Sequence, residues 1–180
     1  IMTTFHGIWS LSGLTGALFG LLMVNLKISP RPHFFIVAGL VIITVVLAWK
    51  YLVPGSSSPA GNNKLFSKPE GVLVKLGIIA FCSMAAEGAM FDWSGVYFRE
   101  VVKAPVSMVI LGYTSFMIMM TAGRFMGDQL IAKIGRKKTL QMSGILVFTG
   151  LTISVLFPWV ITAAIGFMIV GLGASSVIPT

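Results

Sequence analysis

The sequence predicts an all-α membrane protein, a helical bundle of about six transmembrane helices, and two observations support this fold class. Of its 180 residues, 56% are hydrophobic and only 10% are charged, and the mean hydropathy is +0.95. A water-soluble domain of this length does not need so much apolar side chain for its core, so the surplus must face lipid. Apolar windows of about 20 residues, the length that crosses roughly 30 Å of hydrocarbon, recur along the chain. These windows are residues 8–26, 34–53, 72–98, 106–126, 139–157 and 159–178.

The connections between the windows indicate how the helices are grouped. Most are short and contain helix-breaking residues, as in Ser29-Pro30-Arg31-Pro32, which predicts antiparallel neighbours. The connection at 54–70, PGSSSPAGNNKLFSKPE, is longer and has the composition of a flexible linker. It predicts a boundary between two helical bundles. Because the chain begins and ends in apolar runs, we expect it to be a piece of a longer protein.

The positive charges predict the orientation in the membrane. The formal net charge is +8, but the basic residues flank apolar runs and form no stripe interleaved with aromatic residues, so nucleic acid is not an expected partner. Of the 13 Lys and Arg residues, nine lie around the linker and the connection at 127–138, among them Arg124, and four lie on the other side. Since cytoplasmic loops retain positive charge, both segments are predicted to be cytoplasmic.

Two acidic residues interrupt the third window, in the stretch AAEGAMFDWSGVYF. A charged side chain at the bilayer centre costs roughly 2.5–3.5 kcal/mol even on insertion scales, so it usually faces a bundle interior or a water-filled cavity. At 1.5 Å per residue, Glu87 lies about 18 Å from Lys75, near the midplane, and Asp92 lies about 26 Å from it, near the outer surface. Glu87 is therefore the main candidate for a substrate or proton pathway. The alternative is a hydrogen-bonded residue that ties two helices together.

Asp92, Trp93 and Asn25 are weaker candidates for the same pathway. For Asp92, a helix cap at a break over residues 92–95, or an ion pair with Arg99, is the stronger alternative. Trp93 fits an aromatic belt at the outer surface, and Asn25 fits a polar path along the first window. The His, Cys and acidic residues lack the spacing of a metal site, and the sequence predicts no metal and no cofactor.

Enzyme signatures do not support catalysis. The sequence has no HExxH, no GxSxG and no phosphate-binding loop. Glu87 and Asp92 are about 140° apart around a helix, which disfavours a pair of carboxyl groups sharing a proton. We therefore expect no enzymatic activity.

The stretch GRFMGDQLIAKIGRKK occupies residues 123–138. It resembles the loop signature of the major facilitator superfamily, a glycine pair, an acidic residue and a Gly-Arg-Lys run, in the copy between the eighth and ninth helices of that family. Asp128 and Gly135 are seven positions apart, a longer spacing that resembles the fucose-permease-like branch. Two further stretches are similar to that branch: FHGIWSLSGLTGALFG (5–20) to its fifth helix and AAEGAMFDWSGVYF (85–98) to its seventh.

This resemblance implies that the chain is part of a twelve-helix fold and covers about helices 5 to 10. Residues 1–53 would be the last two helices of the N-terminal half, 54–70 the central cytoplasmic linker, and 71–180 the first four helices of the C-terminal half. The resemblance also implies alternating access, in which two halves rock about a midplane substrate site and the signature loop latches one conformation. The implied latch residues are Gly123, Arg124, Gly127, Asp128, Gly135 and Arg136.

Residues and resemblance together predict a secondary active transporter of a small polar solute, with a sugar as one candidate, coupled to protons through Glu87. The expected partners are the solute, protons and the lipid bilayer. The full-length protein is expected to be a monomer in a bacterial inner (plasma) membrane. Two alternatives stay open: a six-helix channel, and a non-transporting membrane protein or intramembrane enzyme.

Overall fold

The computed structural model describes residues 2–51 and 71–177, and each predicted apolar window forms a helix there. The all-α prediction is confirmed. Five helical segments are long and apolar enough to cross a membrane, and the last helix is shorter, with 15 residues. The linker predicted at 54–70 lies outside the described residues. The elements are α1 (Met2–Asn25), α2 (Pro30–Ala48), η1 (Trp49–Tyr51), α3 (Gly71–Glu100), η2 (Val106–Met108), α4 (Leu111–Ile134), α5 (Arg136–Leu156) and α6 (Val160–Ala174).

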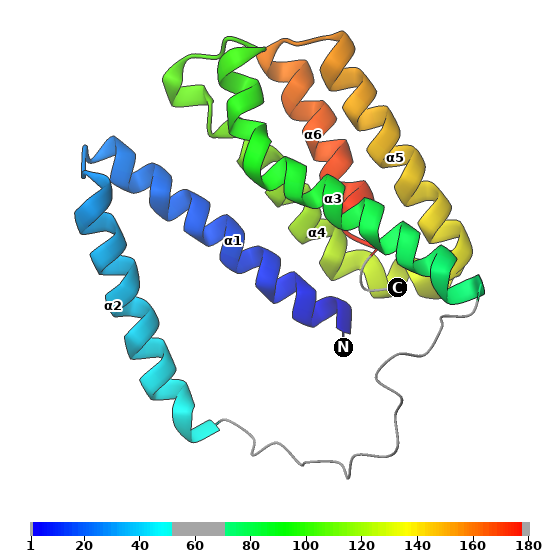
Figure 1. Ribbon diagram of the computed structural model, residues 1–180, viewed down its shortest axis with the longest axis horizontal. Coiled ribbons are helices and arrows are strands. Elements are labelled where there is room, and N and C mark those ends of the chain that lie inside the picture. The colour runs from blue at the N-terminus through cyan, green and yellow to red at the C-terminus, as the bar shows by residue number, and fades with distance from the viewer. Residues whose placement is uncertain (1, 52–70, 178–180) are drawn as a thin grey trace.

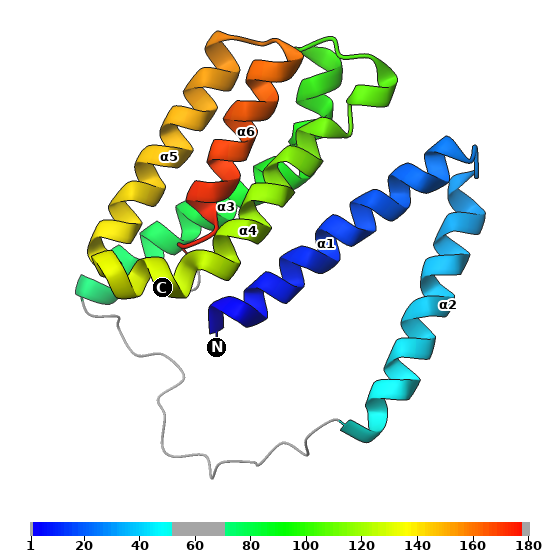
Figure 2. The ribbon, with the colours of Figure 1, turned by 180° about the vertical axis from the view of Figure 1, so that it is seen from behind.

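Helix α4 is the centre of the arrangement. It packs against α6, α1 and α3, while α5 packs mainly against α6 (Figure 1). Helix α2 turns back from α1 and lies on the side of α1 away from the other helices, with none of its side chains buried (Figure 2). The α1–α2 hairpin therefore contacts the α3–α6 bundle through α1.

Glycines allow α4, α5 and α6 to approach closely. A Cβ atom on Gly150 of α5 would lie 2.5 Å from the carbonyl oxygen of Gly166 in α6, and a Cβ on Gly171 would lie 3.0 Å from the backbone nitrogen of Met120 in α4. Lipid tails give no hydrophobic drive for helix association, so close backbone packing of this kind holds membrane helices together. These contacts fix the position of α4, which carries half of the candidate site.

The windows 106–126 and 139–157 predict a connection between helices at residues 127–138, and this prediction is wrong. Helix α4 continues to Ile134 and α5 begins at Arg136, so Gly135 alone connects them. Residues 128–134 contain no helix breaker, and Gly135 has a φ of 81°, which favours glycine and reverses the chain.

The helix break expected at residues 92–95 is also absent, since α3 is continuous from Gly71 to Glu100. Asp92 therefore caps no helix there. The Nε of Arg99, the ion-pair partner expected for Asp92, instead donates to Oε1 of Glu100 at 2.8 Å, and both side chains are exposed. Glu100 is next to Arg99 in the sequence, whereas Asp92 is two helical turns away, so the pair with Glu100 forms more easily.

Candidate functional site

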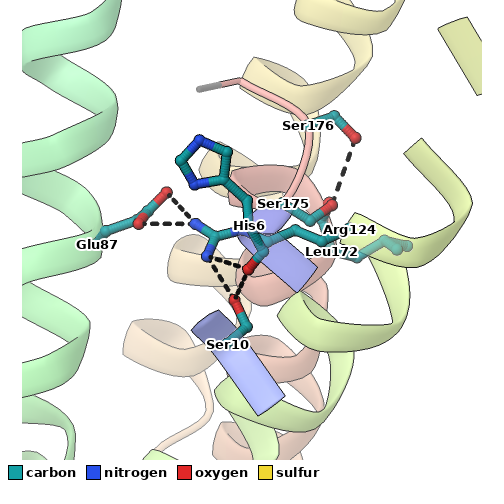
Figure 3. A network of polar contacts seen from close by, with 7 residues as sticks. All are labelled: His6, Ser10, Glu87, Arg124, Leu172, Ser175 and Ser176. Atoms are coloured by element: carbon teal, nitrogen blue, oxygen red, sulfur yellow. Dashed lines mark hydrogen bonds and ion pairs between the residues drawn. The ribbon is translucent and has the colours of Figure 1, made fainter. Parts of the chain in front are cut away.

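An ion pair between Glu87 and Arg124 lies inside the bundle. Glu87 comes from the middle of α3 and Arg124 from α4 (Figure 3). The Nη2 atom of Arg124 donates to Oε1 and Oε2 of Glu87 at 3.3 and 3.1 Å. The side chain of Arg124 is 0% exposed and that of Glu87 is 6% exposed. The structure therefore places both charges away from solvent and lipid.

Arg124 also contacts α1 with its other terminal nitrogen. Nη1 donates to Oγ of Ser10 and, at 3.5 Å, to the backbone carbonyl of His6. Ser10 in turn donates to the same carbonyl at 3.1 Å. The guanidinium carbon lies 5.4 Å from the centre of the Trp9 ring, within range of a cation–π interaction. One side chain thus joins α1, α3 and α4.

The arrangement compensates both buried charges. An isolated charge in an apolar interior is very costly, whereas a paired and hydrogen-bonded one is tolerated. Arg124 is one of the nine basic residues on the predicted cytoplasmic side, but it is buried in the bundle and is not an exposed loop charge. Removing it leaves eight basic residues against four, so the predicted orientation is unaffected.

One cavity is lined by the ion pair, and a second is lined by Ser10 on the neighbouring stretch of α1. The larger, of about 450 Å³, contains the ion pair in a mostly apolar wall, and the smaller is about 200 Å³. Trp9 and Phe91 line both cavities and meet edge to face, with ring centroids 6.3 Å apart. The larger cavity is lined by His6, Trp9, Met84, Glu87, Gly88, Phe91 and Arg124. The smaller is lined by Trp9, Ser10, Ser12, Gly13, Phe91, Tyr113 and Met117.

The other pathway candidates lie outside this network. Asp92, Trp93 and Asn25 are exposed, and Trp93 is 65% exposed. Such exposure agrees with the aromatic-belt interpretation of Trp93. The structure therefore brings none of the three beside Glu87.

The latch candidates fall into a buried set and an exposed set. Gly123, Arg124 and Gly127 are buried, and Gly123 packs against Leu172 of α6 and against Ser175, the residue that follows α6. Asp128, Gly135 and Arg136 are exposed at the junction of α4 and α5. Sequence reasoning gave Glu87 and Arg124 separate roles, whereas the structure makes them partners.

The bond between Ser10 and Arg124 could not be predicted from the sequence, because a serine hydroxyl in a membrane helix commonly bonds to a carbonyl of its own helix. The bond within the helix is present, and the same oxygen additionally accepts from Arg124. The available signal was a pair of opposite charges, Glu87 and Arg124, in neighbouring apolar windows. Within the described parts of the chain, no group of three His, Cys, Asp or Glu residues could hold a metal ion.

Comparisons with known proteins agree with this architecture. The family model of the Major Facilitator Superfamily matches residues 1–180. The chain is 35% identical over 179 residues to an uncharacterized MFS-type transporter of Yersinia pestis, covering 99% of this chain and 46% of that protein. It is 30% identical over 183 residues to the uncharacterized transporter y4wD of Sinorhizobium fredii, covering 99% and 48% respectively. The membrane protein MosC of Rhizobium meliloti is 33% identical over 107 residues, which cover 59% of this chain and 26% of MosC.

No solved structure matches the chain. The chain spans about half the length of the two curated relatives that match nearly all of it. A match to the family model over every residue, together with the apolar helices, decides the classification. The chain belongs to the Major Facilitator Superfamily and is a multi-pass integral membrane protein.

Proposed function

We propose that the complete protein is a secondary active transporter of a small polar solute, coupled to protons and working by alternating access. The family match supports this proposal, and two relatives are named as transporters. A chain that covers 46% and 48% of those relatives fits six helices of twelve. In this proposal, residues 1–53 end the N-terminal half, 54–70 link the halves, and 71–180 begin the C-terminal half. A sugar is the candidate solute, because the motifs resemble the fucose-permease-like branch.

The observation that carries the proposal is the buried carboxylate of Glu87 beside a cavity. Intramembrane carboxylates are costly and commonly mark ion, proton or substrate pathways. A proton and the Arg124 guanidinium compete for this carboxylate, since protonation removes the negative charge that Arg124 neutralises. Proton binding therefore changes a contact between helices, which coupling requires. A six-helix channel would need no such competition.

Glu87→Gln is expected to abolish uphill, pH-driven uptake in proteoliposomes of the full-length protein. Glutamine keeps the shape of the side chain, but it has only one of the two oxygen atoms that accept from Arg124, and it cannot exchange a proton. The solutes tested are a panel of radiolabelled neutral monosaccharides and polyols, first screened by thermal shift, because a bound ligand raises apparent stability.

The matched control is Glu100→Gln, which removes an exposed acidic group from the end of the same helix. This control should accumulate solute as the wild type does. Uphill uptake that survives Glu87→Gln would show that Glu87 is structural. Failure of the wild-type protein to accumulate any panel member would favour the non-transporting alternative.

Asp128→Ala separates a transporter from a channel. Asp128 lies on the last turns of α4, one residue after the buried Gly127, where the signature is proposed to latch one conformation. We expect a several-fold loss of uptake with unchanged protein abundance, measured in the same proteoliposomes, while Gln129→Ala at the adjacent exposed position keeps uptake. Conduction that is indifferent to Asp128→Ala would favour a channel.

A further inference from the structure

We infer that Arg124 and Ser10 are positioning residues that transmit the protonation state of Glu87 to the contact between α1 and α4. This inference rests on the proposed function, in which Glu87 carries the proton. The four groups involved are the Arg124 guanidinium, the Glu87 carboxylate, the Ser10 hydroxyl and the His6 backbone carbonyl, and we call them the clasp.

The clasp divides the donors of Arg124 between two parts of the molecule. Nη2 bonds only to Glu87 among the described contacts, and Glu87 lies on α3, in the same proposed half as α4. Nη1 bonds to Ser10 and to the carbonyl of His6, which lie on α1 in the other proposed half. The guanidinium therefore pairs with the charge of Glu87 in one proposed half through Nη2, and it bonds to α1 of the other proposed half through Nη1 (Figure 3).

Protonation of Glu87 should disturb both sets of bonds. A guanidinium stays charged in proteins, so Arg124 cannot become neutral when its partner does. A buried charge without a counter-ion is strongly unfavourable, and Arg124 is 1% exposed. It must then shift toward water, and that shift withdraws Nη1 from Ser10 and His6. The bonds between α1 and α4 are lost in the same step.

Apart from the Nη1 bonds of Arg124, the α1–α4 contacts described below are apolar. The seam between α1 and α4 also contains apolar contacts, with Gly7 facing the ring of Phe125 and Gly13 facing the methyl group of Met117. At these apolar contacts, α1 and α4 can move apart without breaking a hydrogen bond. The Nη1 bonds of Arg124 add a directional interaction whose strength depends on Glu87.

One further titratable group must be considered. His6 of α1 lines the same cavity as Glu87 and Arg124. The remaining cavity residues from α1 and α3 are uncharged: Trp9, Met84, Gly88 and Phe91. The clasp uses the backbone carbonyl of His6, so His6→Gln preserves the accepting atom while removing the imidazole.

The test measures the α1–α4 distance and needs no solute. Nitroxide labels are attached at Ile8→Cys and Met126→Cys, two exposed positions on α1 and α4, in the full-length protein with Cys82→Ser and any other native cysteines replaced. Pulsed electron spin resonance gives the distance distribution at mildly alkaline and mildly acidic pH. We expect one short-distance population to dominate at alkaline pH and a longer one to grow at acidic pH.

The variants assign that change to the clasp. Glu87→Gln should populate the longer distance at both pH values. Ser10→Ala should raise the longer population at alkaline pH and keep a pH response, because the ion pair remains. Ser12→Ala is the matched control, since this exposed hydroxyl donates to the carbonyl of Trp9 in its own helix. It should behave as wild type, and His6→Gln should keep the pH response.

Two results would overturn the inference: a wild-type distribution that does not change with pH, or Ser10→Ala behaving as Ser12→Ala does. The second comparison remains decisive if Glu87→Gln fails to fold. The proposed function fails separately. If Glu87→Gln abolishes pH-driven uptake while the distances do not respond, the clasp is wrong and proton coupling stands. If the distances respond while Glu87→Gln retains uphill uptake, coupling through Glu87 is wrong and the clasp stands.

Discussion

Glu87→Leu is expected to destabilise the full-length protein by about 3–5 kcal/mol, because it leaves Arg124 buried without a counter-ion. Arg124→Leu should cost less. The carboxyl group of Glu87 can become neutral by taking a proton, whereas a guanidinium cannot lose one. The double variant Glu87→Leu/Arg124→Leu should recover most of the loss, since it buries no charge at all. The measurement is the midpoint of thermal unfolding in detergent, determined from the fraction of protein that remains monodisperse after heating.

The recovery in the double variant is the decisive quantity. Two residues in direct contact give non-additive effects, whereas independent sites give additive ones. A double variant as unstable as the sum of the two single variants would show that the charges do not depend on each other. Glu100→Leu controls for the loss of an acidic residue from α3, because Glu100 is exposed and pairs near the helix end, where such pairs contribute about 0–1 kcal/mol.

The apolar windows predicted the helices because lipid imposes a local rule on the sequence. A segment that crosses hydrocarbon must be apolar and must satisfy its own backbone hydrogen bonds, and both demands are met within one helix. The same windows could not predict where α4 ends. Hydropathy measures contact with lipid, whereas helical hydrogen bonding continues past the apolar run of window 106–126 until Gly135 interrupts it.

The candidate site was predicted only in part, because the sequence shows local properties but not contacts between distant residues. The free-energy cost of placing Glu87 in an apolar helix can be inferred from the apolar residues next to it in the sequence. Its partnership with Arg124 joins residues 37 positions apart, and the bond to Ser10 joins residues 114 apart. Those contacts depend on how α1, α3 and α4 are rotated and how closely they pack. The motif drew attention to Arg124, but a cytoplasmic signature gave no reason to place its guanidinium inside the bundle.

Gly150→Ala is expected to destabilise the bundle by an amount in the upper part of the range of about 1–3 kcal/mol for overpacking. The added Cβ would lie 2.5 Å from the carbonyl oxygen of Gly166 and 2.9 Å from the backbone nitrogen of Val170. Both atoms are main-chain atoms of α6, which cannot rotate aside as a side chain can. Helices α5 and α6 must therefore move apart.

Gly144→Ala provides the matched control on the same helix, because no described atom lies within 4 Å of the added Cβ. Alanine there should be neutral or slightly stabilising, since glycine is disfavoured within helices. Equal unfolding midpoints for the two variants would contradict close α5–α6 packing. Since α6 also supports α4, Gly150→Ala should lower the unfolding midpoint while leaving the charges of the clasp in place. A loss of stability accompanied by an intact pH response of the α1–α4 distance would separate the packing that holds α4 from the ion pair that α4 carries.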